Sequence, residues 1–202
     1  MKPGKKAEKK PHKERKKKKL NSNITTIILI LIFLVGLSVM LYPTVSNYIN
    51  QKHQSKAVAA YDEKVSNMKP EDYTKYFEAA QKYNEELAAH PSAFYNPDEI
   101  KDYEKILDIT GTGIMGYITI KKLGVELPIY HSTDEGILQI AAGHLKGTSF
   151  PISGESTHSV ISAHRGLPSA KLFTDLDKME IGDTFSITVL NQCHLVKLIG
   201  SL

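Results

Sequence analysis

The sequence has one cysteine, Cys193, no tryptophan and only two arginines, Arg15 and Arg165. A single cysteine excludes an internal disulfide framework, so its thiol is either catalytic or incidental. The histidines are not spaced with cysteines or carboxylates as metal ligands are, so no metal and no other cofactor is expected. No internal repeat is visible, and the 202 residues suffice for one ordinary domain with additional segments.

Charge is distributed very unevenly along the chain. Residues 1–20 hold eleven Lys or Arg and two Glu, a formal charge of +9, and since the whole chain is +4 the remainder carries −5. A lysine block of this kind could bind nucleic acid. A hydrophobic segment follows it directly, and no nucleic-acid-reading motif is present, so we expect no nucleic-acid partner.

Residues 24–42, ITTIILILIFLVGLSVMLY, contain no charged side chain. As a helix they would be ~28 Å long, about the hydrocarbon thickness of a bilayer. A cleavable signal peptide is the alternative, but its apolar region usually has ~7–15 residues and ends in small residues. Here Tyr42 and Pro43 end the run. We therefore expect an uncleaved, single-pass signal anchor, with the basic tail in the cytoplasm, near membrane lipid, and the C-terminal domain outside the cell.

Helical patterns fill residues 44–95. Pro70 begins one helix, with Glu71 and Asp72 near the positive end of its dipole. Apolar side chains then recur every three or four residues in one stripe, formed by Tyr73, Tyr76, Phe77, Ala80, Tyr83 and Leu87. These helices are either a stalk or a layer packed on the following domain. We favour packing, because an exposed aromatic stripe is costly.

From residue 113 onward the pattern is that of β-strands. Alternation and turn signals predict strands over residues 115–120, 125–130, 159–163 and 184–190. A short helix is expected over residues 133–142, with Thr133 as its N-cap. His164 follows the third predicted strand, where catalytic residues often occur, although a lone histidine is more often structural.

Four segments of this region, taken in order, carry a family resemblance: GYITIKKLGVELPIYH (116–131), AAGHLKGTSFP (141–151), THSVISAHRG (157–166), and LFTDL with IGDTF (172–185). Their order and spacing closely resemble the pilin-polymerising, class C sortases of Gram-positive bacteria over residues 113–190. The resemblance implies a mainly β, sortase-type barrel of about eight strands, incomplete here. A transmembrane helix and a helical N-terminal segment precede it.

Sortases are membrane-tethered cysteine transpeptidases, and the resemblance implies that activity here. A thiolate cleaves a sorting signal between threonine and glycine, a thioester forms, and in class C a pilin lysine resolves it. The implied partners are the sorting signals of pilins or surface proteins, with a pilin lysine as acceptor. By position His164 matches the family's catalytic histidine. His144 and His158 are expected to be structural or surface residues.

The family's cysteine motif, Thr-Leu-x-Thr-Cys, and the arginine after it are absent from this sequence. Cys193 stands in LNQCHL, only 29 residues after His164, and Arg165 is the last arginine. The resemblance stops near Asn191. We expect a frameshift or premature stop and an inactive copy of the enzyme. The alternative is a non-catalytic, membrane-anchored surface protein that uses a sortase-like fragment for binding.

The expected organisation has six parts. These are a basic cytoplasmic tail (1–23), a transmembrane signal anchor (24–42), N-terminal helices or a stalk (44–95), a linker or lid-like loop (96–112), a partial sortase barrel (113–190) and an aberrant C-terminal tail (191–202). Four or five strands are fewer than such a barrel needs, so a bare edge strand is expected.

Overall fold

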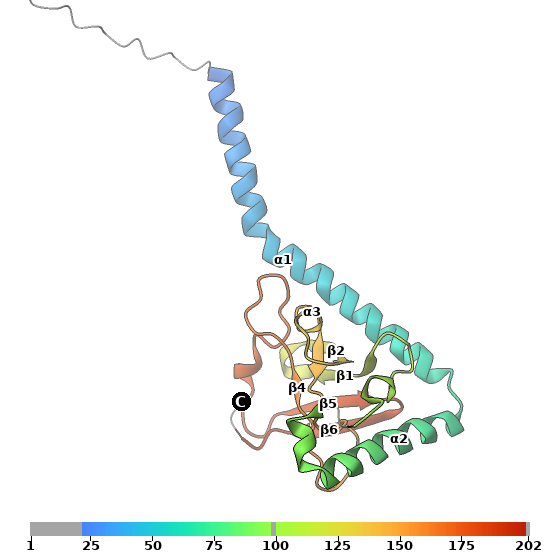
Figure 1. The fold of residues 1–202 in the computed structure, drawn as a ribbon. Helices are drawn as coiled ribbons and strands as arrows, with labels where there is room; N and C mark the ends of the chain where they lie inside the picture. Colours follow the sequence, from blue (N-terminus) through green and yellow to red (C-terminus); the bar gives the residue numbers. More distant parts are fainter. Residues whose placement is uncertain (1–21, 98–99, 201–202) are drawn as a thin grey trace, which may run out of the picture. The chain divides into compact units, whose positions relative to one another are not determined.

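The computed structural model describes residues 22–97 and 100–200. Nearly all of the predicted basic tail therefore lies outside the described residues. The chain divides into two units, Met1–Met40 and Leu41–Leu202. Everything below except the first part of helix α1 belongs to the second unit (Figure 1).

Helix α1 (Ser22–Ser66) contains the whole apolar run and continues through Pro43. Its stretch Asn23–Ser66 is long and apolar enough to cross a membrane, with a mean hydropathy of 2.9 in its most apolar window and none of that window buried. By length and composition a signal sequence would meet the same criterion. Pro43 separates the predicted anchor (24–42) from the predicted N-terminal helices (44–95), but a proline removes only one backbone hydrogen bond, and here the helix continues past it.

Helix α2 (Pro70–Ala89) begins with Pro70 in its first turn, as predicted. Ala80 and Tyr83 are buried, and the other apolar side chains of the stripe are half-buried against the core. The prediction that this stripe packs on the domain is therefore confirmed. Short 3₁₀ turns follow at Pro91–Phe94 and Tyr103–Lys105.

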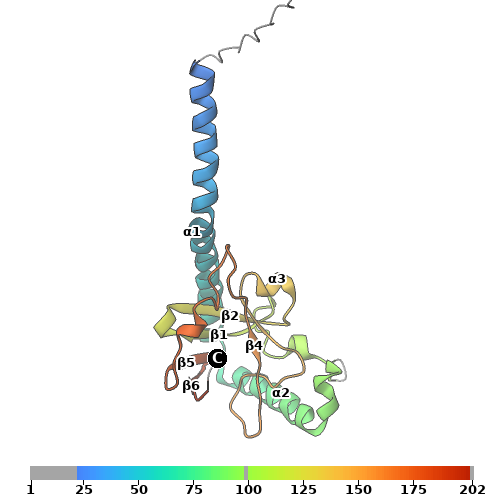
Figure 2. The ribbon, with the colours of Figure 1, turned by 90° about the vertical axis from the view of Figure 1, so that its left-hand side faces the viewer.

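The six strands of the described residues form one sheet: β1 (Ile114–Ile120), β2 (Val125–His131), β3 (Ala142–His144), β4 (Ile161–Ser162), β5 (Thr184–Val189) and β6 (Gln192–Lys197). Their order in the sheet is β4-β3-β2-β1-β5-β6, and β4 and β6 are its two edges. The β2–β3 pair is parallel and the other pairs are antiparallel. The sheet is curled and open rather than closed (Figures 1 and 2).

Two of these strands were not expected from the sequence. Strand β3 has three residues, too few for an alternation to be visible. Strand β6 lies in the segment predicted to be an aberrant tail, yet it pairs with β5 along its whole length. Leu190, with φ of 51°, makes the tight turn between them. The hairpin gives β5 a backbone partner on the side away from β1, where it would otherwise lack one.

Short helix α3 (Glu135–Leu138) lies between β2 and β3. It is shorter than the predicted helix, and its N-cap position is taken by Asp134 rather than Thr133. Both residues fit a helix N-terminus, so the sequence alone could not choose between them.

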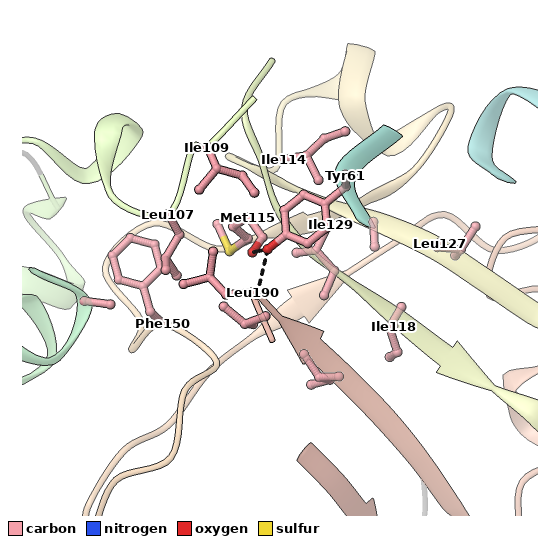
Figure 3. Packing of buried hydrophobic residues seen from close by; sticks show 14 of the residues in the cluster. Tyr61, Leu107, Ile109, Ile114, Met115, Ile118, Leu127, Ile129, Phe150 and Leu190 are labelled. Carbon is pink, nitrogen blue, oxygen red and sulfur yellow. Dashed lines mark hydrogen bonds between the residues drawn. The ribbon is translucent and has the colours of Figure 1, made fainter. Parts of the chain in front are cut away.

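Tyr61 of α1 is at the centre of the core, with no exposed surface. Its hydroxyl donates to the carbonyl oxygen of Met115 at 2.9 Å and accepts the backbone N–H of Leu190 at 2.8 Å. Figure 3 shows its ring among Met115, Ile129 and Leu190. One α1 side chain therefore connects β1 to the β5–β6 turn. Nearby, a Cβ on Gly116 would lie 2.3 Å from the carbonyl oxygen of Thr188, so only glycine allows β1 and β5 to approach this closely.

Candidate functional site

His164 stands two residues after the end of β4, and its side chain is 32% exposed. Its Nε2 lies 3.3 Å from the Oε1 of Glu135, at the start of α3. The structure therefore places the predicted histidine at a strand end with a carboxylate partner. The sequence did not single out Glu135, whose only signal was its place in the first turn of a predicted helix.

The loop after His164 folds back on the strand end. The backbone N–H of Phe173 donates to the carbonyl oxygen of His164 at 3.2 Å. Gly166, with φ of 77°, turns the chain, and its N–H donates to the Thr174 hydroxyl at 3.0 Å. Arg165 turns outward and pairs with Asp177 at 3.0 Å. The backbone at His164 is thus fixed by local contacts.

Side chains of helix α1 form hydrogen bonds with the backbone of the same loop. The side-chain oxygen of Asn47 accepts the N–H of Lys171 at 2.7 Å, and the amide of Asn50 donates to the Ser169 carbonyl at 2.8 Å. One turn further on, Gln54 donates to the carbonyl oxygen of Ile140, just after α3, at 2.7 Å. One face of α1 therefore contacts both the loop after His164 and the chain next to Glu135.

The pKa of Glu135 is lowered, first by a hydrogen bond from Gln139 and then by the one from His164. An ionised Glu135 accepts the Nε2–H of His164. That arrangement leaves Nδ1 as the nitrogen that can take a proton.

Cys193 lies on β6, opposite Thr188 of β5, and is exposed. Side chains alternate along a strand, so Cys193 shares its face with the exposed Leu195, whereas Val196 and Leu198 point to the other face and are half-buried. The edge strands β4 and β6 are separated by four strands in the sheet order. The side chain of Cys193 therefore lies on the outer face of β6, opposite the face that contacts the interior.

An apolar groove of about 200 Å³ lies on the inner side of the curled sheet. It is lined by side chains of β1, β5, residues 173–179, Leu198 and the chain just before His164, namely Ser159 and Ile161. The Ser159 hydroxyl is buried and has no hydrogen-bond partner among the described residues. A larger hollow of about 710 Å³ lies elsewhere, between α1, α2 and residues 105–109.

The two histidines expected to be structural or surface residues, His144 and His158, differ in burial. His144 is fully buried and hydrogen-bonded to Tyr103 and to Ser149, so its role is structural, as predicted. His158 is exposed. Within residues 22–97 and 100–200, no group of three or more His, Cys, Asp or Glu side chains could hold a metal ion.

Known proteins that are similar to this chain are sortases. The model of the Sortase domain family matches residues 118–194. Comparison with curated proteins gives no match. Among solved structures, sortase C1 of Streptococcus agalactiae is 41% identical, with a TM-score of 0.63 over 70% of this chain and 74% of that chain. Sortase C of Streptococcus pneumoniae is 40% identical, with a TM-score of 0.63 over 70% and 72%.

A third structure, another crystal form of the S. agalactiae enzyme, is 35% identical, with a TM-score of 0.65 over 72% of this chain and 75% of that one. The predicted fold class, an incomplete sortase barrel behind a long apolar helix and a helical segment, is confirmed. The curled sheet matches these sortase structures, and the chain belongs to the sortase family, with class C sortases as its structural neighbours.

Proposed function

We propose that this chain carries the histidine half of a membrane-anchored class C sortase, a cysteine transpeptidase that cleaves sorting signals and joins pilin subunits at the cell surface. The observation that carries the proposal is His164 at the end of β4, beside Glu135, in a chain 41% identical to a sortase C1. The structure of one neighbour, sortase C of S. pneumoniae, is described as giving insight into pilin substrate specificity.

The reaction requires three groups. A thiolate attacks the threonine carbonyl, the Thr–Gly amide bond breaks, and an imidazolium gives its proton to the leaving amine. A pilin lysine then attacks the thioester and frees the thiol. A positive charge stabilises the oxyanion at each step. His164 can supply the proton transfer, with Glu135 orienting its ring.

The other two groups have no matching residue in this chain. Cys193, the one thiol, points to the outer face of β6 and is exposed. Arg165 is paired with Asp177. We therefore propose that the 202-residue polypeptide does not catalyse the transfer by itself.

A chimera tests the histidine half directly. Residues 1–190 of this chain would be joined to the part of S. agalactiae sortase C1 that follows the equivalent position. The chimera should cleave a sorting-signal peptide, and His164→Ala should lower the rate by ~10²–10⁴-fold, the usual contribution of a proton-transfer residue. His158→Ala is the matched control, because that side chain is exposed six residues earlier, and its rate should stay within about twofold.

A folded but inactive chimera would overturn the proposal when native sortase C1 cleaves the same peptide. The 202-residue chain is tested in parallel and should show no cleavage. If it does cleave, and Cys193→Ala abolishes the cleavage, the family function stands and the proposed inactivity is wrong.

The same cysteine reports on membrane orientation. We propose that the chain is a single-pass membrane protein with its N-terminus in the cytoplasm and its domain outside, because lysine-rich flanks stay in the cytoplasm. A membrane-impermeant maleimide should then label Cys193 on intact cells. In a Gly4→Cys, Cys193→Ser double variant, labelling should require permeabilised cells. The reverse pattern would contradict the orientation.

A second candidate is a membrane-anchored surface protein that binds but does not catalyse. The apolar groove of about 200 Å³ beside Ser159 favours it. The two candidates are separated by the chimera, since a purely binding chain has no need of a competent His164.

A further inference from the structure

Three amide side chains of α1, those of Asn47, Asn50 and Gln54, recur every three or four residues along one face of the helix. Asn47 and Asn50 are half-buried, and Gln54 is 7% exposed. All three belong to the unit Leu41–Leu202. Further along α1, Tyr61 is fully buried in the core. The helix is therefore firmly seated on the domain, and the three amides have fixed places against it.

The first two amides bind the loop after β4. The side-chain oxygen of Asn47 accepts the N–H of Lys171, and the side-chain nitrogen of Asn50 donates to the carbonyl oxygen of Ser169. Among the described residues, neither backbone group has another hydrogen-bond partner. Leu172, the next residue, is buried and has φ of 39°, a conformation that a residue with a Cβ keeps only where its surroundings impose it. The two amides are part of those surroundings.

The third amide binds the segment that carries the carboxylate. Gln54 donates to the carbonyl oxygen of Ile140, which has no other hydrogen-bond partner within the described part of the chain. Just before Ile140, the side chain of Gln139 donates to the Oε1 of Glu135 at 3.0 Å. The same oxygen lies 3.3 Å from the Nε2 of His164. Helix α1 therefore binds, separately, the two segments that bring the histidine and its carboxylate together.

We propose that Asn47, Asn50 and Gln54 are positioning residues, which set the separation of His164 and Glu135, so that α1 is part of the site as well as an anchor. The proposal rests on the proposed function, because it concerns the same histidine. The amides bind backbone groups on each side of the pair and act through them. Proton transfer depends steeply on geometry, and a displacement of about 1 Å can lower a rate ~10²-fold.

The partners determine which atom each amide presents. A backbone N–H only donates, so Asn47 presents its oxygen to Lys171, and a carbonyl oxygen only accepts, so Asn50 presents its nitrogen to Ser169. An aspartate has the shape of asparagine but, when ionised, only acceptor oxygens. Asn47→Asp should therefore keep its hydrogen bond, and Asn50→Asp should lose it. The same substitution, with the same change of charge, has opposite expected outcomes on one helix face.

Hydrogen exchange of the full chain in detergent micelles, followed by nuclear magnetic resonance, tests the contacts. In Asn50→Asp the protection of the Phe173 amide, whose hydrogen bond closes the loop, should fall by ~10-fold. In Asn47→Asp it should stay within about twofold. Ile118, in the middle of β1, is the internal reference and should keep its protection in both variants. Gln51→Glu, at an exposed position of the same helix, adds the same charge and should leave both amides unchanged.

The chimera of residues 1–190 with the later part of sortase C1 tests the effect on the site. There Asn50→Asp should lower kcat by ~10-fold and leave KM within about twofold, because it moves a proton-transfer group and not a substrate-binding one. Gln54→Glu likewise places an acceptor against a carbonyl oxygen and should behave in the same way. Asn47→Asp should keep both constants. A residue that only stabilises the fold would change the amount of folded enzyme and not its turnover.

Equal losses of Phe173 protection in Asn47→Asp and Asn50→Asp would overturn the assigned contacts. Lost protection with an unchanged kcat would overturn the positioning role and leave the proposed function standing. A chimera that is inactive with α1 unaltered would overturn the proposed function, and the positioning role with it. If Asn50→Asp also loses protection at Ile118, Asn50→Ala, which removes the donor without adding a charge, takes its place and should show the loss at Phe173 alone.

Discussion

Strands β2 and β6 lie in the same sheet but differ sharply in what surrounds them. In β2 five of seven residues are buried, among them Ile129 with no exposed surface. In β6 none of the six residues is buried, and Leu195 is 75% exposed. Strand β2 has a partner on each side and α1 over it, whereas β6 has β5 alone.

The comparison shows that alternation of side chains is not sufficient to build a core. Apolar residues contribute to stability only where a second layer covers them. Here side chains of α1 and α2 belong to the same buried cluster as those of β1 and β2, and the inner side of the sheet near β4 and β5 stays an open groove. His164 lies on the loop that follows β4, and catalytic residues are disproportionately found on loops.

The largest contrast is expected between one isoleucine and one leucine. Ile129→Ala should lower the free energy of unfolding by ~2–5 kcal/mol, because it leaves a cavity in a covered strand. Leu195→Ala on β6 should change it by less than about 0.5 kcal/mol. Urea denaturation of the full chain in detergent measures both. Similar losses for the two variants would mean that β6 is covered in solution.

The second-largest effect is expected at acid pH, where the free energy of unfolding should fall because of the buried His144. The folded-state pKa of His144 is lowered from 6.5 to about 4, so the unfolded state binds the proton more readily between those values. Stability is then full above pH 6.5 and falls as pH decreases through this window, by up to about 3 kcal/mol. Denaturation midpoints at several pH values follow the loss. His144→Gln should reduce the slope, and His158→Gln should preserve it.

The hydroxyl of Tyr61 should have a smaller effect. Tyr61→Phe keeps the ring but leaves the Met115 carbonyl and the Leu190 N–H without this partner. The expected loss is ~1–3 kcal/mol, the usual cost of unsatisfied buried groups. Tyr48→Phe, exposed on the same helix, is the control. An unchanged midpoint for Tyr61→Phe would show that the β5–β6 turn is not held by α1.

The smallest change in stability is expected for ion pairs at the surface. Lys122 pairs with Asp183 at 2.7 Å and with Glu180 at 3.6 Å, and it is solvated. Lys122→Met should barely move the denaturation midpoint, and added salt should remove what difference there is. A loss of stability as large as that of Tyr61→Phe would mean that the β1–β2 turn is far less exposed to solvent than the structure shows.

Much of the fold could be read from local patterns. The apolar run, the start of α2 at Pro70, strands β1, β2 and β5 and the place of His164 each depend on residues within one short segment. Strand β6 could not be predicted, because its residues alternate weakly and are stabilised by pairing with β5. Nor could the carboxylate partner of His164, since Glu135 comes from 29 residues earlier in the chain.

By itself the sequence determined the kinds of element, the apolar helix and the position of the histidine that we propose transfers the proton, because side-chain periodicity and the order of motifs are properties of neighbouring residues. Only the tertiary structure decided that Asn47 and Asn50 hold the loop after His164, that Cys193 points outward, and that both nitrogens of His131 face carbonyl oxygens. These features depend on contacts between segments far apart in the chain, which exist only once the helices have packed on the sheet.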